Sequence, residues 1–156
     1  MSQWLLHPRL SQAVRIILGL VFITAAVPKI ADPPGFAKAI WAYTLVPAWS
    51  LNPLALVLPW LELACGLALC LGFWLRAAIT WIGLLLVSFC LAITINLARH
   101  HAVDCGCFGA AAPKTEAQRL TDMRWVLLRD LGLALLVLQG LAAVKYGSAT
   151  EKESGK

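Results

Sequence analysis

Four long apolar segments constrain the fold of this 156-residue chain more than any other feature of its sequence. The clearest is Ala77–Ala98, which carries no charged side chain. At a helical rise of about 1.5 Å per residue, this segment can cross a hydrocarbon core of about 30 Å. The chain is also 60% hydrophobic and only 13% charged, which is too apolar for a soluble globular domain. The sequence therefore predicts an integral membrane protein.

The other three segments contain few charges. Residues 51–75 hold Glu62 as their single charge, and residues 125–144 hold Arg129 and Asp130 near their start. We expect Pro53 at a turn that opens the 51–75 span and Pro59 at a kink inside it. Residues 10–28, with Arg15 as their charge, form the weakest segment, and Lys29 closes it. The predicted spans are therefore residues 10–28, 51–75, 77–98 and 125–144.

The first segment has a second interpretation. A basic start, the apolar run Ile16–Val27 and the small residues Ala25 and Ala26 are also typical of a cleavable signal peptide. Both interpretations stay open at this point.

A short helix is expected between the first two spans. Pro33, Pro34 and Gly35 interrupt the chain, and apolar residues at Phe36, Ile40 and Tyr43 then follow at helical spacing. This pattern favours a helix lying in the headgroup layer. We thus predict an all-α membrane protein, a four-transmembrane-helix bundle with a short interfacial helix. It forms one domain over residues 1–147, followed by a disordered polar tail at residues 148–156.

The charges indicate lipid as a partner. Lysine and arginine outnumber aspartate and glutamate by 13 to 8, but they are spread along the chain and flank the apolar segments. This distribution suits anionic lipid headgroups and excludes nucleic acid as a partner. An even number of spans places both termini on one side, although the basic residues divide evenly between the two sides and do not say which.

The loop between the last two spans carries most of the recognisable chemistry. It contains two histidines, an aspartate and a Cys-Gly-Cys-Phe-Gly string: His100, His101, Asp104, Cys105, Gly106, Cys107, Phe108 and Gly109. The glycine between the cysteines lets the backbone turn tightly enough to join the two sulfurs. A strained disulfide of this kind has a raised reduction potential and exchanges readily. Two alternatives are a pair of free thiols and a metal site formed by Cys105, Cys107 and His100 or His101.

The remaining three cysteines fit an inert role. Cys65, Cys70 and Cys90 lie inside apolar spans, where free cysteine behaves as a small hydrophobe. Cys65 and Cys70 are about 140° apart around a helix, so they cannot bond to each other within it.

Several polar residues within the spans share one half of the bilayer. If alternate spans are antiparallel, Glu62 and Cys90 lie at about the same depth, on the side of the cysteine loop. The same half holds Lys29, Asn96 and Arg129 with its neighbour Asp130. A charge at mid-span costs about 2.5–3.5 kcal/mol on insertion scales, so we expect Glu62 to face Arg129 or Lys29 in a pocket. The alternative is an ion pair that only fixes helix register.

Five stretches of the sequence resemble the methylamine-utilisation MauE family, in the wider DoxX-like group. They are Gly35–Pro47, Pro59–Gly66, Asn96–Arg99, Asp104–Gly109 and the Arg129-Asp130 pair. The Asp-Cys-Gly-Cys-Phe-Gly string is the most specific of them. Cys65, Cys70 and Cys90 lie outside the family pattern, and we assign them no role.

The resemblance implies a four-helix inner-membrane protein that works with a periplasmic, thioredoxin-like partner to mature the disulfide-rich small subunit of methylamine dehydrogenase. It also implies that the cysteine loop faces the periplasm and that both termini are cytoplasmic. Other relatives resemble general membrane thiol-redox components.

The resulting hypothesis is a thiol–disulfide oxidoreductase component. Cys105 and Cys107 exchange a disulfide with the partner. The supporting residues are those of the loop and of the pocket: Asp104, Gly106, Phe108, Gly109, Glu62, Arg129, Lys29 and Asn96. A quinone held between the spans is an analogy with other four-helix disulfide-generating membrane proteins. A metal-handling membrane protein and a non-catalytic subunit of a membrane complex are the alternatives.

Overall fold

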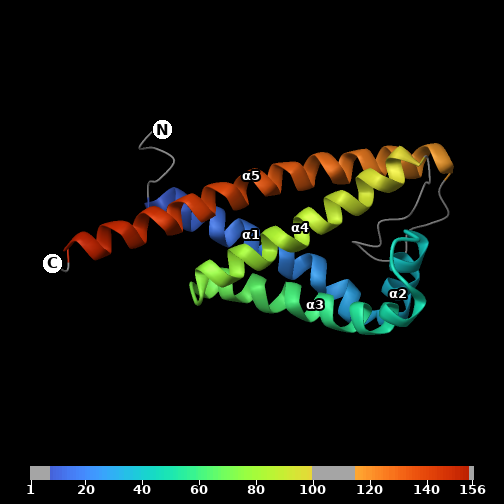
Figure 1. Cartoon of the computed structure of the whole chain (residues 1–156), viewed down its shortest axis with the longest axis horizontal. Helices are drawn as coiled ribbons and strands as arrows, with labels where there is room; N and C mark the ends of the chain where they lie inside the picture. The colour runs from blue at the N-terminus through green and yellow to red at the C-terminus, as the bar shows by residue number, and fades with distance from the viewer. Residues whose placement is uncertain (1–7, 100–114, 155–156) are drawn as a thin grey trace.

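The computed structural model describes residues 8–99 and 115–154 (Figure 1). Within these ranges the chain forms helices and no strand: α1 (Pro8–Ala31), α2 (Pro33–Ala42), α3 (Ala48–Leu71), α4 (Leu75–Ala98) and α5 (Glu116–Ser154). By length and composition, α1, α3, α4 and α5 can each cross a membrane, and α2 is the short helix between the first two. The predicted fold class is confirmed.

The turn between α3 and α4 lies earlier in the chain than predicted from the sequence. The span predicted to reach residue 75 ends at Leu71, because Gly72 adopts a left-handed conformation (φ 80°) and its amide bonds back to the Ala68 carbonyl. Glycine takes this conformation without a steric penalty and is the commonest helix stop. Trp74 is also left-handed (φ 45°), and α4 begins at Leu75.

The opposite end of α3 also differs from the prediction. The helix starts at Ala48, so Pro53 and Pro59 both lie inside it, and Pro53 does not form an opening turn. Proline is tolerated in spanning helices because neighbouring groups satisfy the freed backbone carbonyls.

Helix α5 is longer than the predicted span in both directions. It begins at Glu116, where the Thr115 hydroxyl accepts from the Gln118 amide and the Gln118 side chain accepts from the Thr115 amide. This reciprocal capping box fixes the start of the helix. At the other end α5 continues to Ser154, whereas a disordered tail is predicted from residue 148. The final residues include Glu and Lys, which are good helix formers, and no proline.

The spanning helices form two closely packed pairs, α1 with α3 and α4 with α5 (Figure 1). Gly19 of α1 and Gly66 of α3 lie at the point of closest approach, where a Cβ atom on Gly66 would be 2.9 Å from the Gly19 carbonyl oxygen. Small residues at such crossings let helix backbones approach in a membrane. The close packing of α1 favours its interpretation as a span over the signal-peptide alternative.

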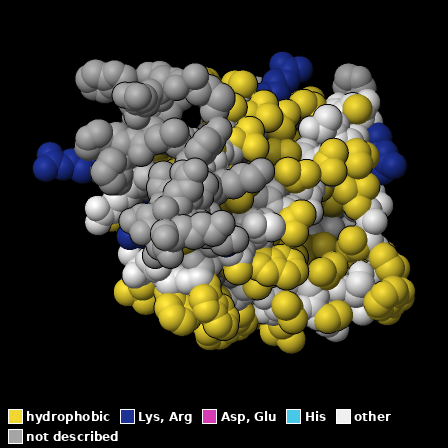
Figure 2. Space-filling model, turned by 60° about the vertical axis from the view of Figure 1, so that its left-hand side comes forward, with side chains coloured by type: hydrophobic (Ala, Val, Ile, Leu, Met, Phe, Trp, Pro, Cys, Tyr) yellow, Lys and Arg dark blue, Asp and Glu magenta, His cyan; other side chains and the backbone are white. Residues whose placement is uncertain are grey.

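The core between the pairs is apolar, with Leu18, Leu69 and Ile82 fully buried. Large apolar side chains also cover much of the described outer surface in Figure 2, and Trp49 and Leu71 are each 80% exposed. An outward apolar surface of this extent suits contact with lipid.

Helix α2 packs against α3 and α1 at the end of the bundle where α4 ends and α5 begins (Figure 1). The Asp32 side chain caps α2 by accepting from the Gly35 amide. Tyr43, directly after α2, is buried against Ile93 of α4 and Met123 of α5. This contact holds the short helix to the bundle.

Candidate functional site

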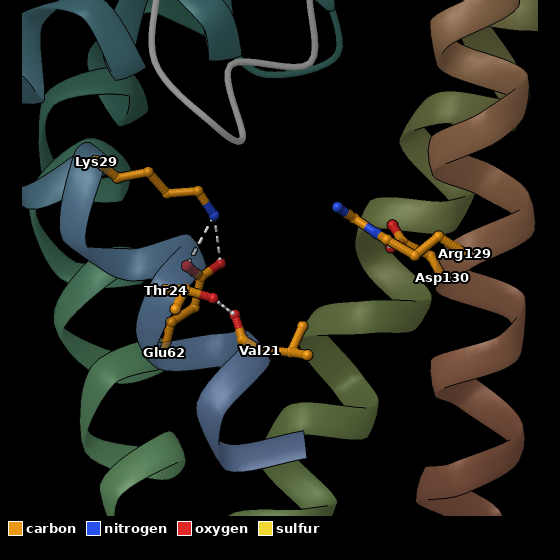
Figure 3. A network of polar contacts seen from close by, with 6 residues as sticks. All are labelled: Val21, Thr24, Lys29, Glu62, Arg129 and Asp130. Atoms are coloured by element: carbon orange, nitrogen blue, oxygen red, sulfur yellow. Dashed lines mark hydrogen bonds and ion pairs between the residues drawn. The ribbon is translucent and has the colours of Figure 1, made fainter. Parts of the chain in front are cut away.

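An ion pair joins α1 to α3 inside the bundle. The Lys29 Nζ atom lies 2.8 Å from Oε1 and 2.7 Å from Oε2 of Glu62 (Figure 3). Both side chains are largely buried, with exposed fractions of 7% and 13%. The ammonium group also lies 5.1 Å from the centre of the Phe36 ring of α2, at cation–π distance. Lys29 therefore connects three helices.

A second charged pair lies on α5. The Nε and Nη2 atoms of Arg129 donate to Oδ1 of the adjacent Asp130, at 3.0 and 2.9 Å. The Arg129 side chain is 37% exposed, whereas that of Asp130 is 2% exposed. Within the described part of the chain, Oδ2 of Asp130 is buried and has no hydrogen-bond partner. A buried carboxylate oxygen without a donor is costly, which marks it as a position where water or a ligand group can donate.

The two pairs face one another across a small cavity, the charged cavity. Figure 3 shows Lys29 and Arg129 extending toward each other from α1 and α5. The cavity volume is about 60 Å³. Liquid water occupies about 30 Å³ per molecule, so the space suits a few waters. Its described lining combines the four charged residues with apolar and aromatic ones: Val21, Phe22, Ala25, Lys29, Glu62, Leu85, Leu86, Phe89, Arg129, Asp130 and Leu133.

The electrostatics of the charged cavity are balanced, because two carboxylates face two cations. Each isolated charge at this depth would cost several kcal/mol, and pairing removes most of that cost. The arrangement can order water and can hold or pass a proton between carboxylates, because Glu62 and Asp130 line the same space.

The structure brings together most of the predicted pocket residues. Glu62 pairs with Lys29, one of its two expected partners, while Arg129 pairs with its own neighbour. Asn96 lies elsewhere, between α4 and Tyr43 at the end of α2, where its Nδ2 donates to the carbonyl oxygens of Tyr43 at 3.3 Å and Ala92 at 3.0 Å. Cys90 is not among the described residues that line the charged cavity.

Asp130 is the inward-facing member of the site that the sequence did not single out. It is only 1% exposed, and it shares a buried stripe on α5 with Met123, Leu133 and Val137. Steps of seven, three and four residues connect these positions, which is the spacing of one helix face. That spacing, read along the sequence, could have identified Asp130 rather than Arg129 as the inward-facing residue.

The three cysteines inside the spans are free thiols. Cys65 is buried in the apolar core, and Cys70 packs beside Gly19. The predicted reactive loop, with its candidate catalytic, supporting and metal-binding residues, lies outside the described residues: His100, His101, Asp104, Cys105, Gly106, Cys107, Phe108 and Gly109. The segment connects α4 to α5 in the sequence, and the end of α4 and the start of α5 lie at the same end of the bundle as α2 (Figure 1).

The fold and the charged cavity define a small multi-pass membrane protein with acidic and basic side chains held among its spans. Residues 7–143 match the family described as methylamine utilisation protein MauE. The chain belongs to this family.

Two relatives illustrate the similarity. The chain is 39% identical to the methylamine utilization protein MauE of Methylorubrum extorquens over 140 residues, which cover 88% of this chain and 71% of the relative. It is 34% identical to the protein of the same name from Paracoccus denitrificans over 163 residues, which cover 99% of this chain and 82% of the relative. No solved structure matches the chain.

Proposed function

We propose that this protein is an inner-membrane thiol–disulfide exchange protein of methylamine utilisation. In this proposal Cys105 and Cys107 exchange a disulfide with a thioredoxin-like partner, which in turn serves a disulfide-containing client, the small subunit of methylamine dehydrogenase. Membership of the MauE family supports the biological setting.

One observation carries the chemical part of the proposal. The charged cavity lies in the half of the bundle that leads to the segment between α4 and α5, which contains Cys105-Gly106-Cys107. Phe89, on its wall, is nine residues before the end of α4, or about 13 Å along the helix. Charged groups cost free energy at this depth, so their presence in the half of the bundle that leads to the segment with Cys105 and Cys107 supports a working site over a scaffold.

The exchange balances without another reactant. A thiolate of the reduced partner attacks one sulfur of the Cys105–Cys107 disulfide and forms a mixed disulfide, releasing the other cysteine as a thiolate. The partner's second thiolate then attacks the mixed disulfide. The partner leaves with a disulfide, both cysteines of this chain are thiols, and two electrons have moved to this chain. The same steps run in reverse.

The geometry of the exchange requires the cysteine segment on the partner's side of the membrane. We place that segment in the periplasm and both termini in the cytoplasm. Four spans return the chain to its starting side, in agreement with this arrangement.

Trapping the mixed disulfide tests the proposal. With Cys107→Ser, the remaining Cys105 should stay bonded to a thioredoxin-like protein and give a reductant-sensitive adduct on non-reducing gels; Cys105→Ser is the reciprocal variant. The matched control is Cys65→Ala, Cys70→Ala and Cys90→Ala together, which should leave both exchange and client maturation intact. Normal disulfide content in the client of cells that carry Cys105→Ser with Cys107→Ser would overturn the proposal.

A further inference from the structure

The end of the bundle opposite α2 carries an open cleft of about 760 Å³, the basic cleft. It lies between the start of α1, the turn that joins α3 to α4, and α5. Ser11, Gly72, Trp74, Arg76 and Val144 are among its lining residues. This volume is within the range of about 300–1,000 Å³ typical of ligand sites.

Arg15 of α1 lies beside the basic cleft, against its lining residue Gly72. Its guanidinium group packs on Gly72, where an added Cβ atom would lie 3.1 Å from Nη1. The Nε atom is buried and has no hydrogen-bond partner within the described residues. Arg15 therefore presents an unused donor and an uncompensated positive charge beside the turn.

Arg76 supplies a second positive charge from the first turn of α4, and its side chain is exposed. Neither arginine forms an ion pair within the described residues, and the described lining of the basic cleft contains no acid. The cap residue of α4, Trp74, makes no side-chain hydrogen bond to the helix, which leaves the first amides of α4 available. The helix dipole adds to the positive potential there.

Aromatic residues beside the basic cleft indicate that it lies at the headgroup level of the membrane. Phe73 and Trp74 stack with ring centres 5.2 Å apart, and they are 62% and 75% exposed. Aromatic side chains at the ends of spanning helices lie at the headgroup level of a membrane. Arginine pairs bind phosphate through charge-assisted, often bidentate hydrogen bonds.

We propose that the basic cleft binds the phosphate group of an anionic phospholipid, with Arg15 and Arg76 as its ligands. The site is independent of the cysteine chemistry proposed above. It ties the turn between α3 and α4 to α1 through the bound headgroup, so the lipid stabilises the contact between the two helix pairs.

Lipid-dependent stability of the purified full-length protein in detergent tests this proposal. Phosphatidylglycerol should raise the Tm, whereas the same concentration of phosphatidylcholine should not. Arg76→Gln, which changes an exposed side chain, should raise the half-saturating concentration of phosphatidylglycerol about tenfold, and Arg15→Gln with Arg76→Gln should abolish the effect. Arg15→Lys, which keeps the positive charge, should retain part of the phosphatidylglycerol effect on the Tm.

The control variant is Arg99→Gln, an exposed arginine at the other end of α4. It should respond to phosphatidylglycerol as the unchanged chain does. An equal response of all variants would overturn the proposal, since the lipid effect would then be non-specific. Competition by millimolar inorganic phosphate without any preference for phosphatidylglycerol would also overturn it, because the site would then be one for free phosphate.

Discussion

The Nζ atom of Lys29 lies 2.7 Å from Oε2 of Glu62, across the interface of α1 and α3. Both residues are largely withdrawn from the surface, so each needs the other to remain charged among the spans. The pair also forms one wall of the charged cavity, which Arg129 and Asp130 close from α5. The contact therefore joins two helices and fixes the Glu62 carboxylate at the charged cavity.

The first prediction concerns this pair. Glu62→Gln should destabilise the protein by about 3–5 kcal/mol, because it leaves the Lys29 ammonium buried without a counter-charge. Unfolding of the purified protein in mixed detergent micelles would measure the loss. Adding Lys29→Gln to Glu62→Gln should restore much of the stability, whereas adding Arg129→Gln should not, since Arg129 pairs with Asp130. Equal rescue by the two second changes would contradict the geometry.

The second prediction concerns the crossing of α1 and α3. Gly19→Ala would place a Cβ atom 2.7 Å from the Gly66 carbonyl oxygen, a backbone atom that cannot move aside cheaply. We expect a loss of about 1–3 kcal/mol. Gly132→Ala in α5 is the matched control, because nothing lies within 4 Å of the added atom. It should be neutral or stabilise by up to about 1 kcal/mol. Similar effects at both positions would refute the close approach.

The third prediction concerns the attachment of α2. Asn96→Leu should cost about 1–3 kcal/mol, because the Tyr43 carbonyl loses a buried donor. Protease accessibility of the segment between α1 and α3 should increase in this variant. Thr94→Val, which changes an exposed side chain that bonds only within its own helix, is the control and should leave accessibility unchanged. Unaltered protease accessibility in both variants would show that Asn96 does not hold α2 to the bundle.

The fourth prediction concerns topology. Reporter fusions at Ala111 should be periplasmic, and fusions after Lys156 should be cytoplasmic, because one span, α5, separates the C-terminus from the segment between α4 and α5 and three spans separate the N-terminus from it. Alkaline phosphatase and fluorescent-protein fusions measure the two sides. The reverse pattern would exclude a periplasmic partner for Cys105 and Cys107.

The sequence was sufficient to predict the four spans and the short helix, because runs of apolar residues as long as Ala77–Ala98 have no other stable solution in a membrane. Helix boundaries were less predictable. Gly72 ends α3 by adopting a left-handed conformation, which depends on backbone geometry rather than on hydropathy. Thr115 and Gln118 start α5 early through a capping box that hydropathy alone does not detect.

The charged cavity was predictable in part. Depth along antiparallel spans placed Glu62 near Lys29 and Arg129, but depth carries no information on which way a helix is rotated. Rotation is what separates the buried Asp130 from the partly exposed Arg129. The buried stripe of α5, which includes Met123 and Val137, is the feature that indicates how this helix is rotated.

The redox state of Cys105 and Cys107 in cells tests the central claim most directly. A chain with Cys65→Ala, Cys70→Ala and Cys90→Ala retains only these two thiols. Acid quenching followed by alkylation with a mass tag would count them. We predict that oxidant blocks both thiols together and that reductant frees both together. The double variant His100→Ala with His101→Ala should respond to oxidant and reductant in the same way. Two thiols that stay free in oxidant, or stoichiometric metal lost on changing the histidines, would contradict the account.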